Sequence, residues 1–113
     1  IAPTTTEERI NKILKKARGF VYLISLLGTT GARKNLQEAT IEKTKWALKH
    51  VKDLPLAVGF GISKREHVSA VVGAGAKGVV VGSAFVALIA KKGEKAVNDL
   101  RKLSLELKEG TKK

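Results

Sequence analysis

The sequence contains no cysteine, which excludes a disulfide framework, a thiolate zinc site and a cysteine nucleophile. It has two histidines, His50 and His67, whose separation does not provide metal-ligand spacing, so we expect no metal and no cofactor. Long hydrophobic runs are also absent: the longest, residues 79–90, is interrupted by Gly82 and Ser83 and is too short to span a bilayer. With no signal-peptide pattern, this predicts a cytoplasmic protein without a membrane partner.

Methionine is missing as well, and the first residue is Ile1. Because a natural chain begins with methionine, which is removed mainly before a small residue, we interpret the sequence as a processed, excised or partly recorded chain. Its 113 residues suffice for one packed domain rather than two. A composition rich in lysine and free of cysteine and methionine is typical of thermophilic proteins.

Aromatic side chains make up only 4% of the sequence, although its net charge is +12. A nucleic-acid interface usually combines a concentrated basic face with aromatic or arginine side chains that contact bases. Here the basic excess is spread over all predicted helices, in residues 7–18, 33–53, 64–77 and 91–113. We therefore expect solvated helix faces and no nucleic-acid partner. A polyanion-binding protein is nevertheless one hypothesis to test. A flat salt dependence of nucleic-acid binding would exclude it.

Three short apolar segments predict β-strands, at residues 20–25, 56–61 and 78–81. None of them alternates with polar residues, so we expect strands that are buried on both faces. Predicted helices separate them, and this alternation is typical of βαβ units and a parallel sheet. A doubly wound sheet and a (β/α) barrel are both compatible with it. The G-x-G-x-x-G fingerprint of a dinucleotide site is absent, because Lys64 stands three residues after Gly61.

Capping residues and apolar spacing predict where the helices lie. A capping box at Thr5 and Glu8 begins the first helix, and a second one at Ser63 and Glu66 begins the helix after the second strand. An apolar helix at residues 84–90 directly follows the third strand. The side chains predicted to face inward are Ile10, Ile13, Leu14, Ala17, Ile41, Thr44, Leu48, Val51, Val68, Val71, Val72, Ala96, Val97, Leu100, Leu103 and Leu107.

Glycine-rich segments end or follow all three predicted strands, at residues 28–31, residues 59–61 and the pair Gly82-Ser83. Because functional residues of parallel α/β folds gather at the carboxyl ends of the strands, we expect these segments to lie together. Glycine lets a ligand approach the backbone, and Ser83 offers a hydroxyl at a helix start, where free N–H groups favour anions. A tight turn explains any one glycine, but the three segments together predict a phosphate site.

Groups for acid–base or nucleophilic chemistry are missing from these strand ends. All ten acidic residues lie on predicted helices or their flanks, and His50 and His67 fall within helices, which does not favour a catalytic role. Tyr22 lies inside the first strand, where core packing and a place in a binding site are both open, and Trp46 is expected to pack its helix against the sheet. The sequence thus predicts a phosphate site and no catalytic residue in this chain.

Several motifs occur in the order and spacing of one known family. They are residues 19–25 (GFVYLIS) leading to residues 28–33 (GTTGAR), residues 58–63 (VGFGIS) and residues 80–84 (VVGSA). The chain closely resembles the C-terminal half of the tryptophan synthase alpha chain, from residues 1–5 (IAPTT), similar to the end of that family's fifth strand, to about Ala90. The resemblance implies a parallel (β/α)8 TIM barrel, of which this chain covers roughly the C-terminal half.

The same resemblance implies a substrate and the residues that bind it. Family members split indole-3-glycerol phosphate into indole and glyceraldehyde 3-phosphate, and a pyridoxal-phosphate beta chain receives the indole in a heterotetramer. Tyr22 is implied to line the substrate pocket, and Thr30 to lie on a loop that closes over the substrate. The residues implied to hold the substrate phosphate are Gly31, Gly59, Phe60, Gly61, Gly82 and Ser83.

The chain also departs from the family, because it has under half of the roughly 250 residues of such a barrel. Strands one to four and most of the fifth are missing, and with them the two carboxylates that the family uses as acid and base. We expect one domain, with barrel units at residues 1–90, a terminal helix at 91–108 and a frayed tail at 109–113. We expect this chain alone to be inactive as a lyase.

A structural module is the alternative hypothesis. An isolated half-barrel has two open sheet edges and uncovered apolar faces, which favour self-association or pairing with a complementing N-terminal half. Sedimentation of the chain as a stable monomer would count against this hypothesis.

Overall fold

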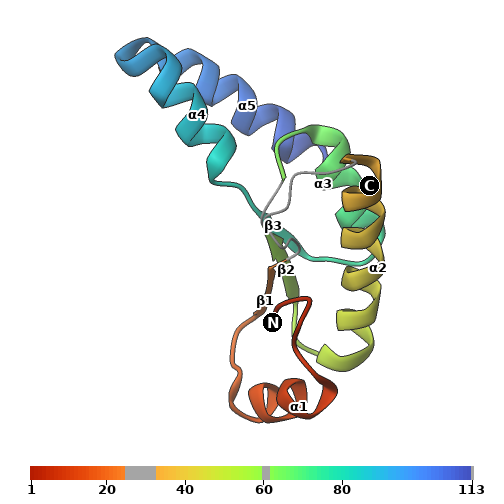
Figure 1. Ribbon diagram of the computed structural model, residues 1–113. Coiled ribbons are helices and arrows are strands. Elements are labelled where there is room, and N and C mark those ends of the chain that lie inside the picture. Colours follow the sequence, from red (N-terminus) through yellow and green to blue (C-terminus); the bar gives the residue numbers. More distant parts are fainter. Residues whose placement is uncertain (25–32, 60–61, 113) are drawn as a thin grey trace.

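The computed structural model describes residues 1–24, 33–59 and 62–112, which form a parallel sheet with helices packed against it (Figure 1). The predicted alternation of strands and helices is confirmed, and a short 3-10 helix, η1, precedes the last helix. The elements, in chain order, are α1 (Glu7–Lys16), β1 (Val21–Ile24), α2 (Arg33–Val51), β2 (Leu56–Gly59), α3 (Arg65–Gly73), β3 (Gly78–Val80), α4 (Ser83–Lys92), η1 (Gly93–Ala96) and α5 (Val97–Glu109).

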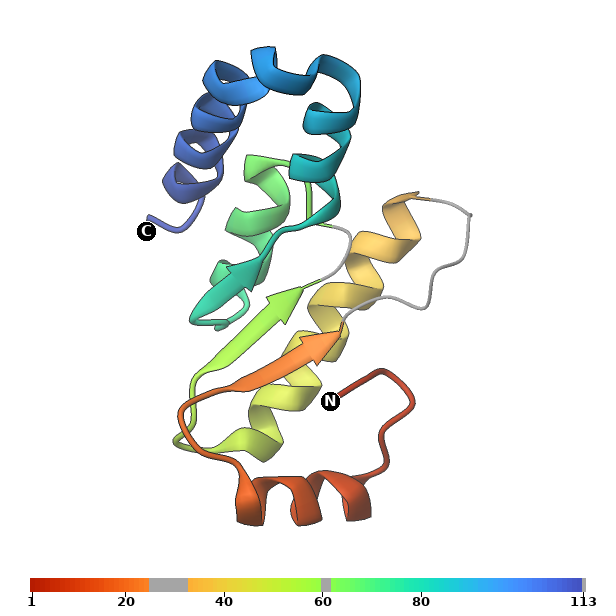
Figure 2. The same cartoon turned by 90° about the vertical axis from the view of Figure 1, so that its left-hand side faces the viewer.

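The three strands are parallel and lie in the order β1-β2-β3. In the register of the sheet, Gly59 lies opposite Ile24 on one side and opposite Val80 on the other. Parallel neighbours need a crossover connection, and α2 and α3 supply it across the same face of the sheet, behind the strands in Figure 2. All three strands therefore point their carboxyl ends toward one edge.

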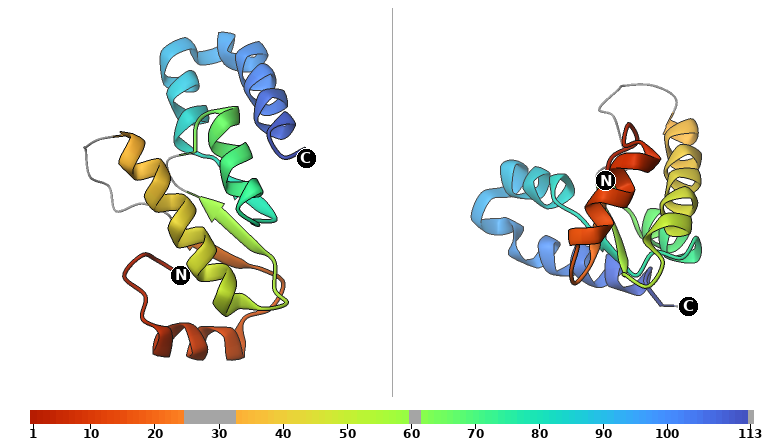
Figure 3. Two further views of the ribbon diagram at one scale, coloured as in Figure 1. Left: turned by 90° about the vertical axis from the view of Figure 1, so that its right-hand side faces the viewer. Right: turned by 90° about the horizontal axis from the view of Figure 1, so that it is seen from below.

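The two faces of the sheet differ in burial. Leu23 and Val58 belong to the core beneath the helices and are fully buried. Among the described residues no helix covers the opposite face, where Ile24 is 40% exposed and Val80 is 44% exposed (Figures 1 and 3). The prediction of strands buried on both faces is therefore wrong for this chain, because successive side chains point to opposite faces and only one face is covered.

The core lies between the sheet and the crossover helices. Thr44 is a fully buried polar residue of α2, and its hydroxyl donates a hydrogen bond to the Thr40 carbonyl oxygen at 2.7 Å, so the buried polar group is satisfied. Trp46 packs partly buried against the core, as expected. The inward positions of α3 are confirmed, since Val68, Val71 and Val72 are all buried.

Thr6, rather than Thr5, caps α1. The Thr6 hydroxyl accepts a hydrogen bond from the Arg9 N–H at 3.3 Å. The Thr5 hydroxyl instead accepts one from the Ala2 N–H at 2.9 Å, so Thr5 closes the turn that precedes the helix. The capping box predicted at Thr5 is therefore wrong by one residue.

Helices α4 and α5 form a hairpin that extends past the carboxyl ends of the strands (Figure 2). No residue of α4 is buried, and Val86 is 63% exposed. At the turn, the Lys92 ammonium pairs with the Asp99 carboxylate, and this hydrogen bond holds the pKa of Asp99 below its usual value. Val97, the first residue of α5 directly after η1, was expected to face inward but is 69% exposed, so this prediction is wrong.

The end of the chain packs against α3 up to Gly110, within the segment expected to fray. Gly110 is buried, and its carbonyl oxygen accepts a hydrogen bond from the Ser69 hydroxyl at 3.2 Å. A Cβ atom at position 110 would lie only 2.8 Å from the Arg65 carbonyl oxygen. Glycine thus permits the close approach of the two backbones that fixes this segment.

Candidate functional site

The carboxyl ends of the strands define the candidate site. Gly59 ends β2 at this edge of the sheet, between Ile24 and Val80. Helix α4 starts just beyond β3, with Gly82 as its N-cap and Ser83 as its first residue. The end of β2 and the start of α4 lie at the same edge of the sheet (Figure 2). Gly59, Gly82 and Ser83 belong to these ends, which is the placement that a shared binding site requires.

Tyr22 lies over Gly59 on the open face of the sheet. In the strand register Tyr22 is opposite Ala57, yet a Cβ atom added to Gly59 would lie 2.7 Å from Cζ of the Tyr22 ring. The ring thus leans along the strand toward the carboxyl edge and occupies the space that a side chain at position 59 would fill. Tyr22 is half-buried and lies outside the core cluster, which favours a place in a binding site over core packing.

The start of α4 is an electropositive helix terminus. Its first turn contains no acidic residue, and its N-cap, Gly82, has no side chain that could accept a hydrogen bond from the first N–H groups. Ser83 and Gly82 are both exposed. Because the first N–H groups of a helix have no partner within it and the helix dipole favours negative charge there, this terminus can bind an anion.

Half of the predicted site lies within the described residues. Its described members are Tyr22, Gly59, Gly82 and Ser83. The other four predicted residues, Thr30, Gly31, Phe60 and Gly61, lie outside the described residues, so their roles stay predictions from the sequence.

His50 lies away from this edge, near the end of α2. Its Nδ1 is 2.9 Å from the Trp46 carbonyl oxygen, and its Nε2 is 3.4 Å from the Glu7 carboxylate. Glu7 belongs to α1, which lies near the end of the sheet where the strands begin (Figure 1). His50 therefore links α2 to α1 and has no contact with the candidate site that would give it a catalytic role.

His67, in contrast, lies in the first turn of α3, just after the candidate site. The helix begins at Arg65, and its N-cap, Lys64, makes no side-chain capping bond. The Ser63 N–H donates a hydrogen bond to Nδ1 of His67 at 3.1 Å. The capping box predicted from Ser63 and Glu66 is therefore wrong, because the helix starts one residue later than that box requires. Sequence reasoning missed this contact, because no spacing rule predicts a histidine ring that reaches back to the residue before the N-cap.

Neither the described strand ends nor the first turn of α4 includes an acidic residue, so no carboxylate there can transfer a proton. Across the described ranges, no three His, Cys, Asp or Glu side chains gather in a way that could hold a metal ion. Within the same residues, every helix is too short or too polar to cross a membrane.

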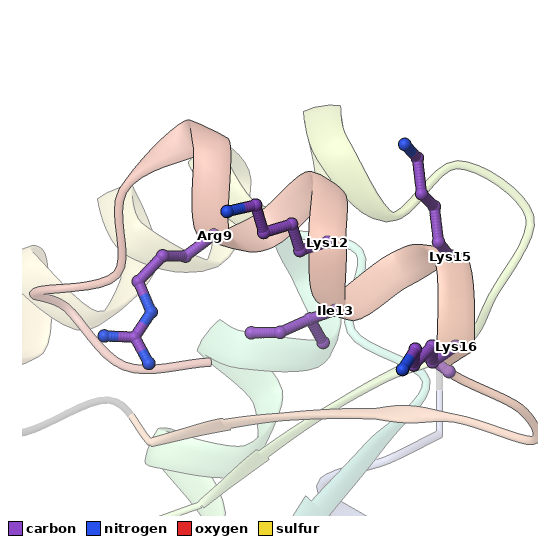
Figure 4. A pocket seen from close by; sticks show the side chains of 6 residues that line it. Arg9, Lys12, Ile13, Lys15 and Lys16 are labelled. Atoms are coloured by element: carbon purple, nitrogen blue, oxygen red, sulfur yellow. The ribbon is translucent and has the colours of Figure 1, made fainter.

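A separate hollow of about 700 Å³ lies along α1 (Figure 4). Ile13, which was expected to face the core, lines this hollow and is 39% exposed. A smaller hollow shares Arg9 and Ile13 with it and reaches Ile24 of β1, the edge strand of the sheet. An apolar part of α1 is therefore uncovered beside the open edge of the sheet. The lining residues are Arg9, Lys12, Ile13, Lys15, Lys16 and Ala17.

Comparison with known proteins agrees with this fold and with the sequence motifs. The family model described as the tryptophan synthase alpha chain matches residues 1–113. The chain is 50% identical to the tryptophan synthase alpha chain of Methanopyrus kandleri over an alignment of 114 positions. The alignment covers 99% of this chain and 41% of that protein. It is 52% identical to that of Pyrococcus abyssi over 106 residues, which cover 94% of this chain and 42% of that protein.

Solved structures give the same result. The tryptophan synthase α2β2 complex of Pyrococcus furiosus contains a chain that matches with a TM-score of 0.82 and 46% identity, covering 95% of this chain and 43% of that one. The separate alpha subunit from the same organism matches with a TM-score of 0.80 and 43% identity, covering 95% and 42%. This chain thus has the fold of one part of a parallel (β/α)8 TIM barrel, roughly its C-terminal half. It spans about two-fifths of its relatives' length.

Proposed function

The chain belongs to the tryptophan synthase alpha chain family, and from this premise we propose that it supplies the phosphate-binding half of an indole-3-glycerol-phosphate lyase. The complete enzyme would cleave indole-3-glycerol phosphate to indole and glyceraldehyde 3-phosphate in tryptophan biosynthesis. The observation that supports this is the carboxyl edge of the sheet, where the half-buried Tyr22 lies over Gly59 and α4 starts just beyond β3. Because the chain spans about two-fifths of its relatives, catalysis needs residues that it does not contain.

Each described site residue has a role that its geometry supports. Ser83 and the first N–H groups of α4 form charge-assisted hydrogen bonds to the phosphate oxygens, which are stronger than neutral ones. Gly59 leaves space for the Tyr22 ring, whose flat face lines the substrate pocket. The family resemblance adds Gly31, Phe60 and Gly61 to the phosphate site and assigns loop closure to Thr30.

No residue of this chain is proposed as the general acid or base. General acid–base catalysis contributes about 10²–10⁴-fold to a reaction rate, and the described strand ends carry no group for it. The isolated chain is therefore proposed to bind the phosphate of its substrate without cleaving the substrate. No cofactor is proposed for this half of the reaction.

A beta chain is the proposed partner of the complete protein. The P. furiosus relative was solved as a tryptophan synthase α2β2 complex, and the chain matches its structure over 95% of its own length. The proposed location is the cytoplasm, where a biosynthetic enzyme of this kind meets its substrate.

An inactive half-barrel that associates with itself or with a complementing N-terminal half is the second candidate. The uncovered sheet face at Ile24 and Val80 favours it, as does the hollow along α1, because both leave apolar surface exposed to water. This candidate differs from the first in one respect: it requires no phosphate site.

Titration calorimetry of the chain with indole-3-glycerol phosphate tests the first candidate. Ser83→Asp adds a negative charge at the start of α4 and should weaken binding by about tenfold or more, because it repels the phosphate. Ser104→Asp adds the same charge on the exposed surface of α5 and should leave binding unchanged. Equal affinity of the two variants would contradict the proposed site, and release of indole by the chain alone would contradict its proposed inactivity.

A further inference from the structure

The hollow along α1 combines apolar and basic side chains (Figure 4). Its apolar part consists of Ile13, which is 39% exposed, and the half-buried Ala17, one helical turn further on. A segment that fills the hollow must therefore offer apolar surface together with negative charge. Every other described residue that lines the hollow is basic: these are Arg9, Lys12, Lys15 and Lys16.

Helix stability explains only some of these positive charges. Lys15 and Lys16 lie in the last turn of α1, where the helix dipole favours cations. Lys12 pairs with the Glu8 carboxylate at 3.4 Å. Arg9, in contrast, is the third residue of the helix, where the dipole disfavours a cation, and no carboxylate of the described residues forms an ion pair with it. Its position therefore favours an acidic group that a partner supplies.

A second copy of the chain does not fit this chemistry. The sequence has 22 basic and 10 acidic residues, and the basic excess is spread over all its helical segments. Another copy would bring further positive charge to the hollow, and like charges across an interface oppose binding. The chain covers only 41% of the M. kandleri relative, so the family contains further segments that can supply the partner.

Nucleic acid and lipid also fit the hollow less well than protein does. No aromatic side chain of the described residues lines it, so bases would find nothing on which to stack. A helix that lies on a membrane needs a wide apolar face. In α1, Ile10 is fully buried and Leu14 packs against the core, which leaves only Ile13 and Ala17 in the hollow. Residues three and four apart line it along the helix, and this shape suits a second, amphipathic helix.

We propose that the hollow along α1 is a docking site for an acidic amphipathic helix that these 113 residues do not include. An apolar side chain of the partner packs on Ile13, and its carboxylates pair with Arg9 and Lys16. The inference rests on the half-barrel that is the second candidate function, and it adds the chemistry of the partner that docks beside the open edge of the sheet.

Fluorescence anisotropy of labelled helical peptides, titrated with the chain, tests this proposal. The probe peptide has leucines along one face and glutamates beside them, and its control peptide has lysines in place of the glutamates. Arg9→Gln/Lys16→Gln removes two positive charges from the hollow, and Ile13→Ser removes the apolar contact. Lys95→Gln/Arg101→Gln removes the same charge from exposed positions outside the hollow and is the matched control. Because Lys16 also stabilises the end of α1, Arg9→Gln alone provides a variant in which the helix keeps its stability.

The glutamate peptide should bind the wild-type chain, and added salt should weaken this binding because it screens exposed charges. Arg9→Gln/Lys16→Gln should lower the affinity by about three- to tenfold, and Arg9→Gln or Ile13→Ser by about threefold. The control double variant should stay within about twofold of the wild type, and the lysine peptide should bind about tenfold more weakly than the glutamate peptide.

Failure of the wild-type chain to bind the glutamate peptide would overturn the proposal, as would equal affinity of the two double variants or of the two peptides. Tighter binding of duplex DNA or of phosphatidylglycerol vesicles, lost in Arg9→Gln/Lys16→Gln, would assign the hollow to another class of partner. Dissociation of self-associated chains by Ile13→Ser would assign it to a second copy. None of these results tests the open sheet face at Ile24 and Val80, so the half-barrel candidate stands or fails separately.

Discussion

Gly59 and Tyr22 show at the scale of single residues how a missing side chain shapes the candidate site. The Tyr22 ring lies where a Cβ atom of residue 59 would be, within 2.8 Å of Cε2. Glycine is needed here for space rather than for an unusual backbone angle, since Gly59 is not among the residues with positive φ. The pair therefore acts as one packing unit, in which the smaller residue sets the position of the larger.

Replacing Gly59 with alanine should destabilise the chain by about 1–3 kcal/mol, because the added methyl group displaces the Tyr22 ring. The measurement is the free energy of unfolding from urea denaturation. Gly73→Ala is the matched control, since a Cβ there meets no atom within 4 Å, and it should leave stability unchanged or slightly higher. In a Tyr22→Ala background the Gly59→Ala substitution should cost much less, and an undiminished cost would exclude the contact as the cause.

The two neighbouring threonines before α1 have different tasks. Thr6→Ala removes the capping bond to the Arg9 N–H and should lower the free energy of unfolding by about 0.5–2 kcal/mol, measured by thermal denaturation. Thr6→Ser keeps the hydroxyl and should behave like the wild type. A loss of equal size in Thr6→Ser would show that the methyl group, and not the cap, carries the effect.

At the scale of elements, the α4–α5 hairpin depends on a contact across its turn. The Lys92 ammonium and the Asp99 carboxylate join the end of α4 to the first turn of α5, and η1 lies between them. The hydrogen bond from Lys92 is the main cause of the lowered pKa of Asp99, with smaller contributions from the charges of Lys102 and Lys91. The stability of the hairpin should therefore depend on pH.

Because the folded state lowers the pKa of Asp99, this carboxylate stabilises the fold above its unfolded pKa of about 3.9. That contribution should be lost as the pH falls through the lower folded value. The thermal midpoint of the wild type should therefore decrease more between pH 7 and pH 3 than that of Asp99→Asn. Glu106→Gln, an exposed position on the same helix, is the control and should keep the wild-type dependence. Identical pH profiles for Asp99→Asn and the wild type would contradict the role of this pair.

At the scale of the whole molecule, half of the sheet surface has no cover within the described residues. Ile24 and Val80 are exposed on the open face, and Phe20 is 59% exposed just before β1. In a closed barrel this face points to the interior, which side chains from all strands fill. The open face therefore exposes to water the apolar side chains that a closed barrel would bury.

This surface predicts association of the isolated chain. Sedimentation should show dimers or larger species, and the double variant Ile24→Lys/Val80→Lys should shift them toward the monomer, because charges on the open face oppose contact. Leu105→Lys, at a position of α5 that is 62% exposed, is the control and should not change the distribution. A wild-type chain that sediments as a monomer at all concentrations would contradict the prediction.

The local patterns in the sequence predicted the elements and their order correctly, but not every boundary. Apolar runs identify strands such as β1 and β2, and 3.6-residue spacing identifies helices such as α3. Both patterns reflect which side chains are removed from water when the chain folds. The caps were placed one residue early before both α1 and α3. Before α1, Thr5 and Thr6 have equal capping ability, whereas α3 begins after Lys64, which makes no side-chain capping bond. Which of them caps the helix depends on the path of the chain before it.

In the candidate site, too, the sequence predicted some features and not others. Glycine-rich strand ends indicated where Gly59, Gly82 and Ser83 would gather, because parallel strands bring their carboxyl ends to one edge. The lean of the Tyr22 ring over Gly59 and the reach of His67 to Ser63 depend on side-chain directions that no spacing rule contains.

The sequence by itself determined the alternation of strands and helices, the parallel sheet and the absence of an acid or base at the described strand ends, because each follows from local composition and chain direction. Only the tertiary structure decided which apolar residues are buried. Val80 and Val58 are chemically alike, yet one is 44% exposed and the other fully buried, because helices cover a single face of the sheet. Burial depends on what packs against a residue, and that is a property of the assembled fold.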